Sequence, residues 1–170
     1  DTILAALIGS IQPRKGQKDF VEAIKKIKLN RGSEIEETKF LIVGDLLNDT
    51  HEDYLLDIKE IISKNGLQDD VIFLGRRDDV ISIMKQIDLV VLPSYSEGLP
   101  RTILESFSCS CPVIATKVAG ASEIINDKEN GILIRPGDID ELANSMLYLI
   151  KDRKRRSAMG PQGRRCIENQ

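Results

Sequence analysis

Aromatic residues are scarce in this chain of 170 residues: they make up 4% of it, and tryptophan is absent. Proteins that bind single-stranded nucleic acid stack bases on aromatic side chains and attract phosphates with a positive field. The formal net charge here is -3, so the chain as a whole has no electrostatic attraction to nucleic acid. We therefore expect no nucleic-acid partner.

Histidine and cysteine are also rare. His51 is the single histidine, and the cysteines are Cys109, Cys111 and Cys166. An odd number of cysteines without regular spacing does not predict a disulfide framework, and two nearby thiols fall short of the four ligands of a structural zinc site. We expect small buried thiols in a reducing compartment, and no metal.

Long apolar runs are missing as well. No run approaches the roughly 20 residues that a membrane-spanning helix needs, and the first residues lack the basic-then-apolar order of a signal peptide. The sequence starts at Asp1, without methionine and at the edge of an apolar run. We therefore expect a cytoplasmic chain that is a fragment of a longer protein.

The sequence does contain an alternation of short apolar runs with longer amphipathic segments. Continuous apolar runs are typical of strands buried on both faces of a parallel sheet, and the segments between them carry apolar residues at helical spacing. We predict strands at 3–9, 39–44, 71–75, 88–93, 113–116 and 131–135, and helices at 18–29, 54–64, 80–84 (capped by Asp78 or Asp79) and from a cap at Asp138 or Asp140 toward 150. This order predicts an α/β fold, with one Rossmann-like domain over residues 1–170 and helices on both faces of its sheet.

In such sheets the ligand lies beyond the carboxyl ends of the strands. The loop after strand 88–93 reads Ser94-Tyr95-Ser96-Glu97-Gly98-Leu99-Pro100. Pro100 suits the first turn of a helix, and a helix that begins there directs free amides and its positive dipole end into the crevice. We therefore predict a phosphate site. The carboxylates of Glu97 and Glu105 fit beside it as acceptors for the hydroxyls of a sugar or ribose.

This segment resembles the signature of the retaining glycosyltransferases of family 4, which is a glutamate, seven residues and a second glutamate, here Glu97 and Glu105. The resemblance extends over nearly the whole chain. Further blocks in the family's order are 13–16, 71–76, 111–116, 120 with 123–125, and 130–131 with 136–138. The number and order of these blocks make the resemblance specific.

The resemblance implies a GT-B-type enzyme with two Rossmann-like domains, of which this chain is the C-terminal, donor-binding half and lacks the N-terminal acceptor domain. It implies a nucleotide-diphosphate sugar as the donor and a glycan or lipid-linked acceptor, in surface polysaccharide biosynthesis. No metal or other cofactor is expected, because basic side chains and a helix terminus hold the diphosphate. The isolated domain is expected to be inactive alone.

The resemblance also assigns roles to residues. Glu97 and Lys15 are the expected catalytic residues: Glu97 contacts the donor sugar, and Lys15 neutralises the diphosphate. Glu105 holds the ribose, Arg76 lies near the base, and the amides of residues 98–99 meet the sugar or the phosphates. The expected donor-binding residues are Ser10, Arg14, Lys15, Arg76, Glu97, Gly98, Leu99, Thr102 and Glu105.

One position departs from the family pattern. The family usually has arginine after the glycine of the first strand, but this chain has Ser10 after Gly9. The serine removes one cation from the expected diphosphate clamp. Arg14, next to Lys15, is a candidate substitute.

Two other functions stay open. The first is a sugar-nucleotide epimerase of the same architecture, which the lack of a useful histidine disfavours, and the second is a non-catalytic nucleotide-binding module. A nicotinamide dehydrogenase is disfavoured, because the loop 9–13 carries no Gly-any-Gly-any-any-Gly pattern. The basic stretch 151–156, with Arg164 and Arg165, fits either a solvated helix face, the missing domain or a peripheral contact with the inner face of a membrane.

Overall fold

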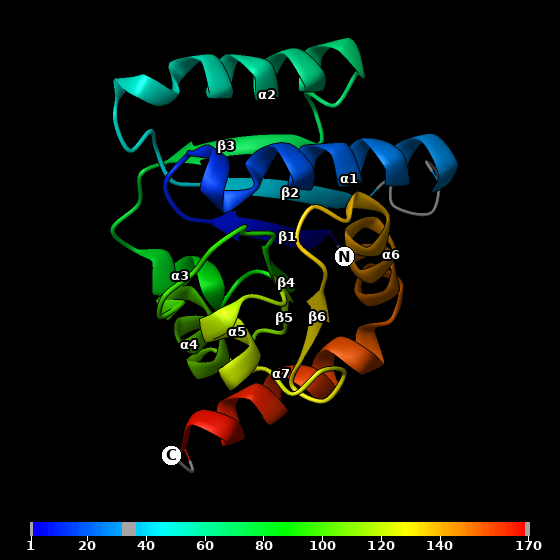
Figure 1. Ribbon diagram of the computed structural model, residues 1–170. Coiled ribbons are helices and arrows are strands. Elements are labelled where there is room, and N and C mark those ends of the chain that lie inside the picture. The colour runs from blue at the N-terminus through cyan, green and yellow to red at the C-terminus, as the bar shows by residue number, and fades with distance from the viewer. Residues whose placement is uncertain (1, 32–36, 169–170) are drawn as a thin grey trace.

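The computed structural model describes residues 2–31 and 37–168, and within them six parallel strands form one sheet (Figure 1). The strand order is β3-β2-β1-β4-β5-β6. The strands are β1 (Ile3–Ile8), β2 (Thr38–Val43), β3 (Val71–Gly75), β4 (Leu89–Leu92), β5 (Val113–Thr116) and β6 (Gly131–Ile134). All the predicted strands are confirmed, with ends that differ by at most one residue.

Helices cover both faces of the sheet (Figure 1). On one face lie α1 (Gln17–Arg31), α2 (Glu52–Lys64) and α6 (Ile139–Lys151), and on the other lie α3 (Val80–Met84), α4 (Arg101–Ser108) and α5 (Ala119–Ile124). The C-terminal helix α7 (Arg153–Glu168) packs against α4 and α6, and two short 3-10 turns, η1 (Pro13–Lys15) and η3 (Asp49–His51), precede α1 and α2. The predicted α/β fold is confirmed, although α5 was not anticipated.

The strands are apolar at successive positions because each face of the sheet has its own core. In β1, Ala5 and Leu7 pack with α1 and α2, whereas Ala6 and Ile8 pack with the layer of α3, α4 and α5. All four side chains are at most 6% exposed. A strand buried on both faces cannot alternate apolar with polar residues, which accounts for the continuous runs in the sequence.

One predicted helix cap is confirmed, and two helix starts differ from expectation. Asp138 caps α6, since its Oδ1 accepts from the Glu141 amide at 2.8 Å. Asp79 occupies the N-cap position of α3 without capping it, because its carboxylate is bonded to Arg77 instead. Pro100 precedes α4 as its N-cap and is not in its first turn.

The basic stretch 151–156 is only partly solvated. Arg156 is 8% exposed, and its guanidinium donates to the carbonyls of Leu149 at 2.6 Å and Ile150 at 2.7 Å. It also pairs with Asp88 at 3.3 Å. Arg156 therefore ties the end of α6 to the start of β4, so at this position the expectation of a solvated or membrane-facing residue is wrong. In the described part of the chain, every helix is too short or too polar to span a bilayer.

Candidate anion-binding site

The site lies where the strand order changes direction. β1 pairs with β2 on one side and with β4 on the other. The chain after β1 runs to α1 on one face, and the chain after β4 runs to α4 on the opposite face. The two chain segments therefore leave the sheet toward opposite faces, and the region at the carboxyl ends of β1 and β4, which is the usual ligand position in such sheets, is here called the crevice.

Lys15 and Glu97 meet in this crevice. Lys15 Nζ lies 2.7 Å from Glu97 Oε1, and the two side chains are 17% and 10% exposed. Arg14 Nη1 lies 3.8 Å from Glu97 Oε2 and donates to the Ser96 carbonyl at 2.7 Å. Three of the predicted site residues, separated by about 80 positions in sequence, are thus brought together, with two cations around one carboxylate.

Two glycines allow the loops of the site to interlock. A Cβ on Gly16, which has a φ of +72°, would overlap the carbonyl of Pro93. A Cβ on Gly120 would overlap the Gly98 carbonyl and lie 2.6 Å from Pro100 Cδ. Because glycine has no Cβ, α1 and α5 begin close enough to fix both ends of the loop 93–100.

The start of α4 offers groups that the protein does not use itself. The N-cap of α4 makes no side-chain capping bond, and the amides of Gly98 and Leu99 donate to no residue that the structure describes. Thr102 lies in the first turn, and the half-buried Glu105 carboxylate has no polar partner among the described residues. Free amides at a helix N-terminus suit an anion, and a free carboxylate suits hydroxyl groups.

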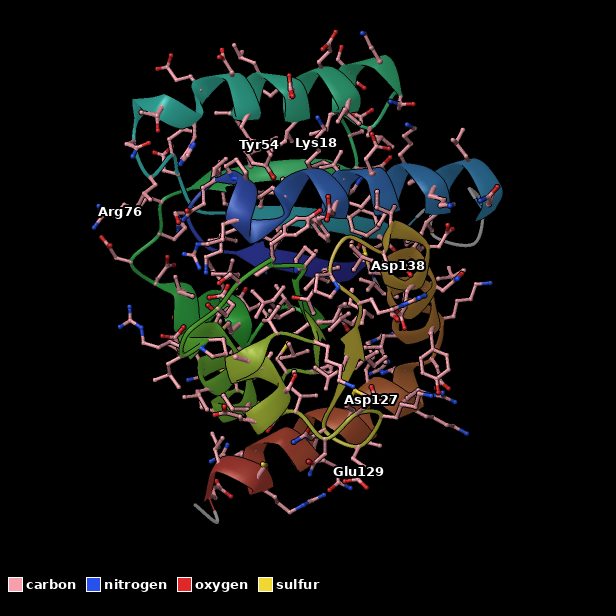
Figure 2. All side chains as sticks on the ribbon, in the orientation of Figure 1. Lys18, Tyr54, Arg76, Asp127, Glu129 and Asp138 are labelled. Atoms are coloured by element: carbon pink, nitrogen blue, oxygen red, sulfur yellow. The ribbon has the colours of Figure 1, made fainter. Side chains whose placement is uncertain are left out.

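A hollow of about 370 Å³ adjoins the ion pair, lined among others by Gly9, Ser10, Gly44 and Arg76. It connects with the pair because a Cβ on Gly9 would lie 3.7 Å from Lys15 Cδ. The Ser10 hydroxyl accepts from Gln12 Nε2 at 2.6 Å. Arg76 is exposed on the segment between β3 and α3, and it makes no ion pair with a described residue (Figure 2). Its guanidinium is therefore available to a ligand.

A larger hollow of about 750 Å³ lies between α1 and the loop before α6. Its basic side chains are already paired with acidic neighbours, which leaves no free charge for a ligand. These pairs are Lys25–Glu22, Lys26–Asp140 and Arg135–Asp138. The region at Lys15 and Glu97 is the better candidate site, because the start of α4 and Arg76 beside it offer groups without a partner among the described residues.

The structure adds two residues that sequence reasoning did not assign to the site. The Tyr95 hydroxyl donates to Asp19 Oδ2 at 2.7 Å. This hydrogen bond and burial raise the pKa of Tyr95 to about 12. Burial raises the pKa of Asp19, an effect that the bond from Tyr95 opposes. No local pattern links a tyrosine after β4 with an aspartate in α1, so only the fold reveals this contact.

The fold and the crevice together define a Rossmann-like domain whose site suits a ligand with both phosphates and hydroxyls. The sequence profile of the family described as glycosyl transferases group 1 matches residues 1–166. The chain belongs to this family, which confirms the resemblance found in the sequence.

Curated relatives agree with this assignment. The chain is 33% identical over 159 residues to an uncharacterised glycosyltransferase of Methanocaldococcus jannaschii, across 92% of this chain and 41% of the relative. It is 32% identical over 155 residues to the UDP-Gal:alpha-D-GlcNAc-diphosphoundecaprenol alpha-1,3-galactosyltransferase of Escherichia coli, across 90% of this chain and 38% of that protein. The chain thus spans about two fifths of the length of these relatives.

Solved structures share the fold. HepE of Anabaena, crystallised with UDP and glucose, superimposes with a TM-score of 0.90 at 28% identity, over 99% of this chain and 44% of HepE. The C-terminal domain of the group 1 protein LpcC from Francisella tularensis gives a TM-score of 0.89 at 28% identity, over 99% of this chain and 85% of that one. The GT-B-type fold prediction is confirmed by these likenesses.

Proposed function

We propose that this chain is the C-terminal, donor-binding domain of a retaining glycosyltransferase. The whole enzyme binds a nucleotide-diphosphate sugar and transfers the sugar, a hexose, to a glycan or lipid-linked acceptor in surface polysaccharide biosynthesis. The observation that carries this proposal is the Lys15–Glu97 pair at the crevice, 2.7 Å apart, beside the uncapped start of α4. An N-terminal domain supplies the acceptor site, so the isolated chain binds the donor without transferring the sugar.

The diphosphate lies against Lys15 and the amides of Gly98 and Leu99. When the bond to the sugar breaks, negative charge grows on the departing diphosphate, and a fixed cation with oriented amides stabilises that charge without reorganising. Arg14, 3.8 Å from Glu97, adds a second positive charge at the same place. This arrangement needs no metal ion and no other cofactor.

The carboxylates accept hydrogen bonds from the hydroxyl-bearing parts of the donor. The half-buried, unpartnered Glu105 in α4 accepts from the ribose hydroxyls, and Glu97 accepts from the sugar hydroxyls. Thr102, in the first turn of α4, borders the phosphates. The base lies in the hollow that Ser10 and Arg76 line.

Relatives support the donor class without choosing the base. The Escherichia coli relative is named for UDP-Gal, and a Corynebacterium glutamicum relative, 30% identical over 176 residues, is named as GDP-mannose-dependent. UDP and GDP are therefore the first nucleotides to test. A lipid-linked acceptor would bring the whole protein to the inner face of the membrane, where exposed basic residues of α7, such as Lys154 and Arg165, would lie against anionic headgroups.

Calorimetric titration of the 170-residue chain with UDP, GDP and ADP tests the proposal. One of these should bind, and Glu105→Ala should weaken it by about 1–3 kcal/mol, because a charged hydrogen-bonding partner is lost. Glu52→Ala, at an exposed position in the first turn of α2, is the matched control and should bind normally. Absence of binding at millimolar nucleotide would contradict the donor-domain assignment, and undiminished binding by Glu105→Ala would contradict the role of Glu105.

A further inference from the structure

A side-chain contact joins the loop after β4 to the first turn of α1. The Tyr95 hydroxyl donates to Asp19 Oδ2 at 2.7 Å, while the tyrosine as a whole is 50% exposed. A half-exposed ring adds little to the hydrophobic core, so this tyrosine is held in place mainly by its hydroxyl. The main effect of this contact is therefore to hold the loop against α1, and its contribution to core packing is small.

The backbone of the same loop is tied to η1. The Tyr95 amide donates to the Arg14 carbonyl at 2.9 Å, and the Arg14 guanidinium donates to the Ser96 carbonyl at 2.7 Å. Both residues that precede Glu97 are thus bonded to the segment that follows β1. A shift of this loop would carry the Glu97 carboxylate with it.

Two side-chain contacts, four residues apart along the segment after β1, connect it with the loop. Lys15–Glu97 is the first, and it joins groups that the proposed donor contacts. Asp19–Tyr95 is the second, and neither of its residues is one that the proposed nucleotide sugar contacts. We propose that the Tyr95–Asp19 hydrogen bond is a positioning contact, which fixes the loop so that the Glu97 carboxylate faces the donor sugar. The binding part of this inference rests on the proposed function.

The surroundings keep this contact in place. Because the pKa of Tyr95 is raised to about 12, by its bond to Asp19 first and by burial second, the hydroxyl keeps the proton that it donates. A Cβ on Gly137 would lie 3.4 Å from the Tyr95 hydroxyl, so the loop before α6 limits movement of the tyrosine on its other side. Sequence distant from β4 thus helps to place the site loop.

Four single variants of the 170-residue chain, and the double variant Tyr95→Phe with Asp19→Ala, test the inference. Tyr95→Phe removes the hydroxyl that donates the hydrogen bond, and Asp19→Ala removes the carboxylate that accepts it. Asp19→Asn keeps an amide oxygen that can still accept this bond. Tyr148→Phe is the matched control, since Tyr148 is 46% exposed and packs its ring against Arg155, 3.7 Å from the ring centroid. Exchange of the Tyr95 amide hydrogen, which donates to the Arg14 carbonyl, is measured without nucleotide, and affinity is measured for a nucleotide sugar and for its nucleoside diphosphate.

We expect Tyr95→Phe and Asp19→Ala each to speed exchange of the amide at position 95 and to weaken binding of the nucleotide sugar, both by about tenfold. Binding of the nucleoside diphosphate should weaken less, because Glu97 contacts the sugar. The double variant should lose no more affinity than either single variant, since both single changes remove the same hydrogen bond. Asp19→Asn should restore most of the loss, and Tyr148→Phe should change neither measurement.

Unchanged exchange in the nucleotide-free Tyr95→Phe chain would overturn the inference. Equal losses for the nucleotide sugar and the nucleoside diphosphate, or additive losses in the double variant, would also overturn it, because they indicate general destabilisation. If the unaltered chain binds no nucleotide, the proposed function fails, and the exchange result alone then decides whether the contact positions the loop.

Discussion

Glu97 is paired with Lys15, the cation that the proposed diphosphate needs. Removing the negative charge of Glu97 should therefore tighten the binding of a nucleoside diphosphate. The Lys15 and Glu97 side chains are 2.7 Å apart and only 17% and 10% exposed. At this separation and an effective dielectric constant of about 20, the Coulomb attraction is about 6 kcal/mol, most of which the loss of hydration offsets. An arriving diphosphate must compete with the remainder for Lys15.

Measured couplings for close, desolvated charge pairs are about 1.5–7 kcal/mol. We take a value near the lower end, about 2 kcal/mol, because the diphosphate shares Lys15 with Glu97 without excluding it completely. Glu97→Gln, which keeps the size of the side chain and removes its charge, should then bind a nucleoside diphosphate about 30-fold more tightly. The gain should be smaller for the nucleotide sugar, since the sugar hydroxyls lose a charged acceptor.

Calorimetry with the nucleoside diphosphate and with the nucleotide sugar measures both effects. Glu60→Gln is the matched control, because it removes the same charge from an exposed pair with Lys64 in α2, and we expect no change from it. Weaker or unchanged binding of the nucleoside diphosphate by Glu97→Gln would refute the competition for Lys15. A gain of the same size in Glu60→Gln would point instead to the overall charge of the chain.

Three other predictions concern the stability of the fold and the reactivity of a buried thiol. Gly120→Ala should destabilise the fold by about 1–3 kcal/mol in urea unfolding, because its Cβ overlaps the site loop; Gly98→Ala, with nothing within 4 Å of its Cβ, should leave stability unchanged. Arg156→Met should lower the free energy of unfolding by about 3 kcal/mol or more, since two carbonyls and Asp88 lose a buried partner, whereas Arg164→Met in an exposed pair should change it by less than about 1 kcal/mol. Burial raises the pKa of Cys111 to about 12, so at pH 8 its thiol stays protonated, and iodoacetamide should label the two half-buried cysteines before it; labelling of Cys111 at the same rate in the folded chain would contradict this.

The sheet was predictable because its pattern is local. A run such as Leu89–Leu92, buried at every position, has the composition of a doubly covered strand, and no other part of the chain is needed to recognise it. Helix caps were less predictable, because side chains have competing partners. The Asp79 carboxylate accepts from the Arg77 guanidinium at 2.8 Å and makes no capping bond to the amides of α3.

The sequence named a set of candidate site residues, which stays a prediction, but it could not indicate the contacts between them. Lys15 and Glu97 each matched a family block, yet their 2.7 Å contact depends on β1 lying next to β4, which the order of elements along the chain does not determine. Tyr95 and Asp19 had no signal at all, because neither residue type is unusual at its position. Contacts between loops that follow different strands can be derived only once the strand order is known.

The charges around Glu97 bear on Ser10, which stands where the family usually has arginine. Ser10 directs its hydroxyl to Gln12 and supplies no charge, but Arg14 lies 3.8 Å from Glu97. Arg14, Lys15 and Glu97 together carry one more positive than negative charge. An excess of positive charge at the end of β1 would attract a diphosphate. We therefore propose that Arg14 supplies the second cation in place of the family's usual arginine, and we expect it to contribute more to diphosphate binding here than its counterpart does where the arginine is present.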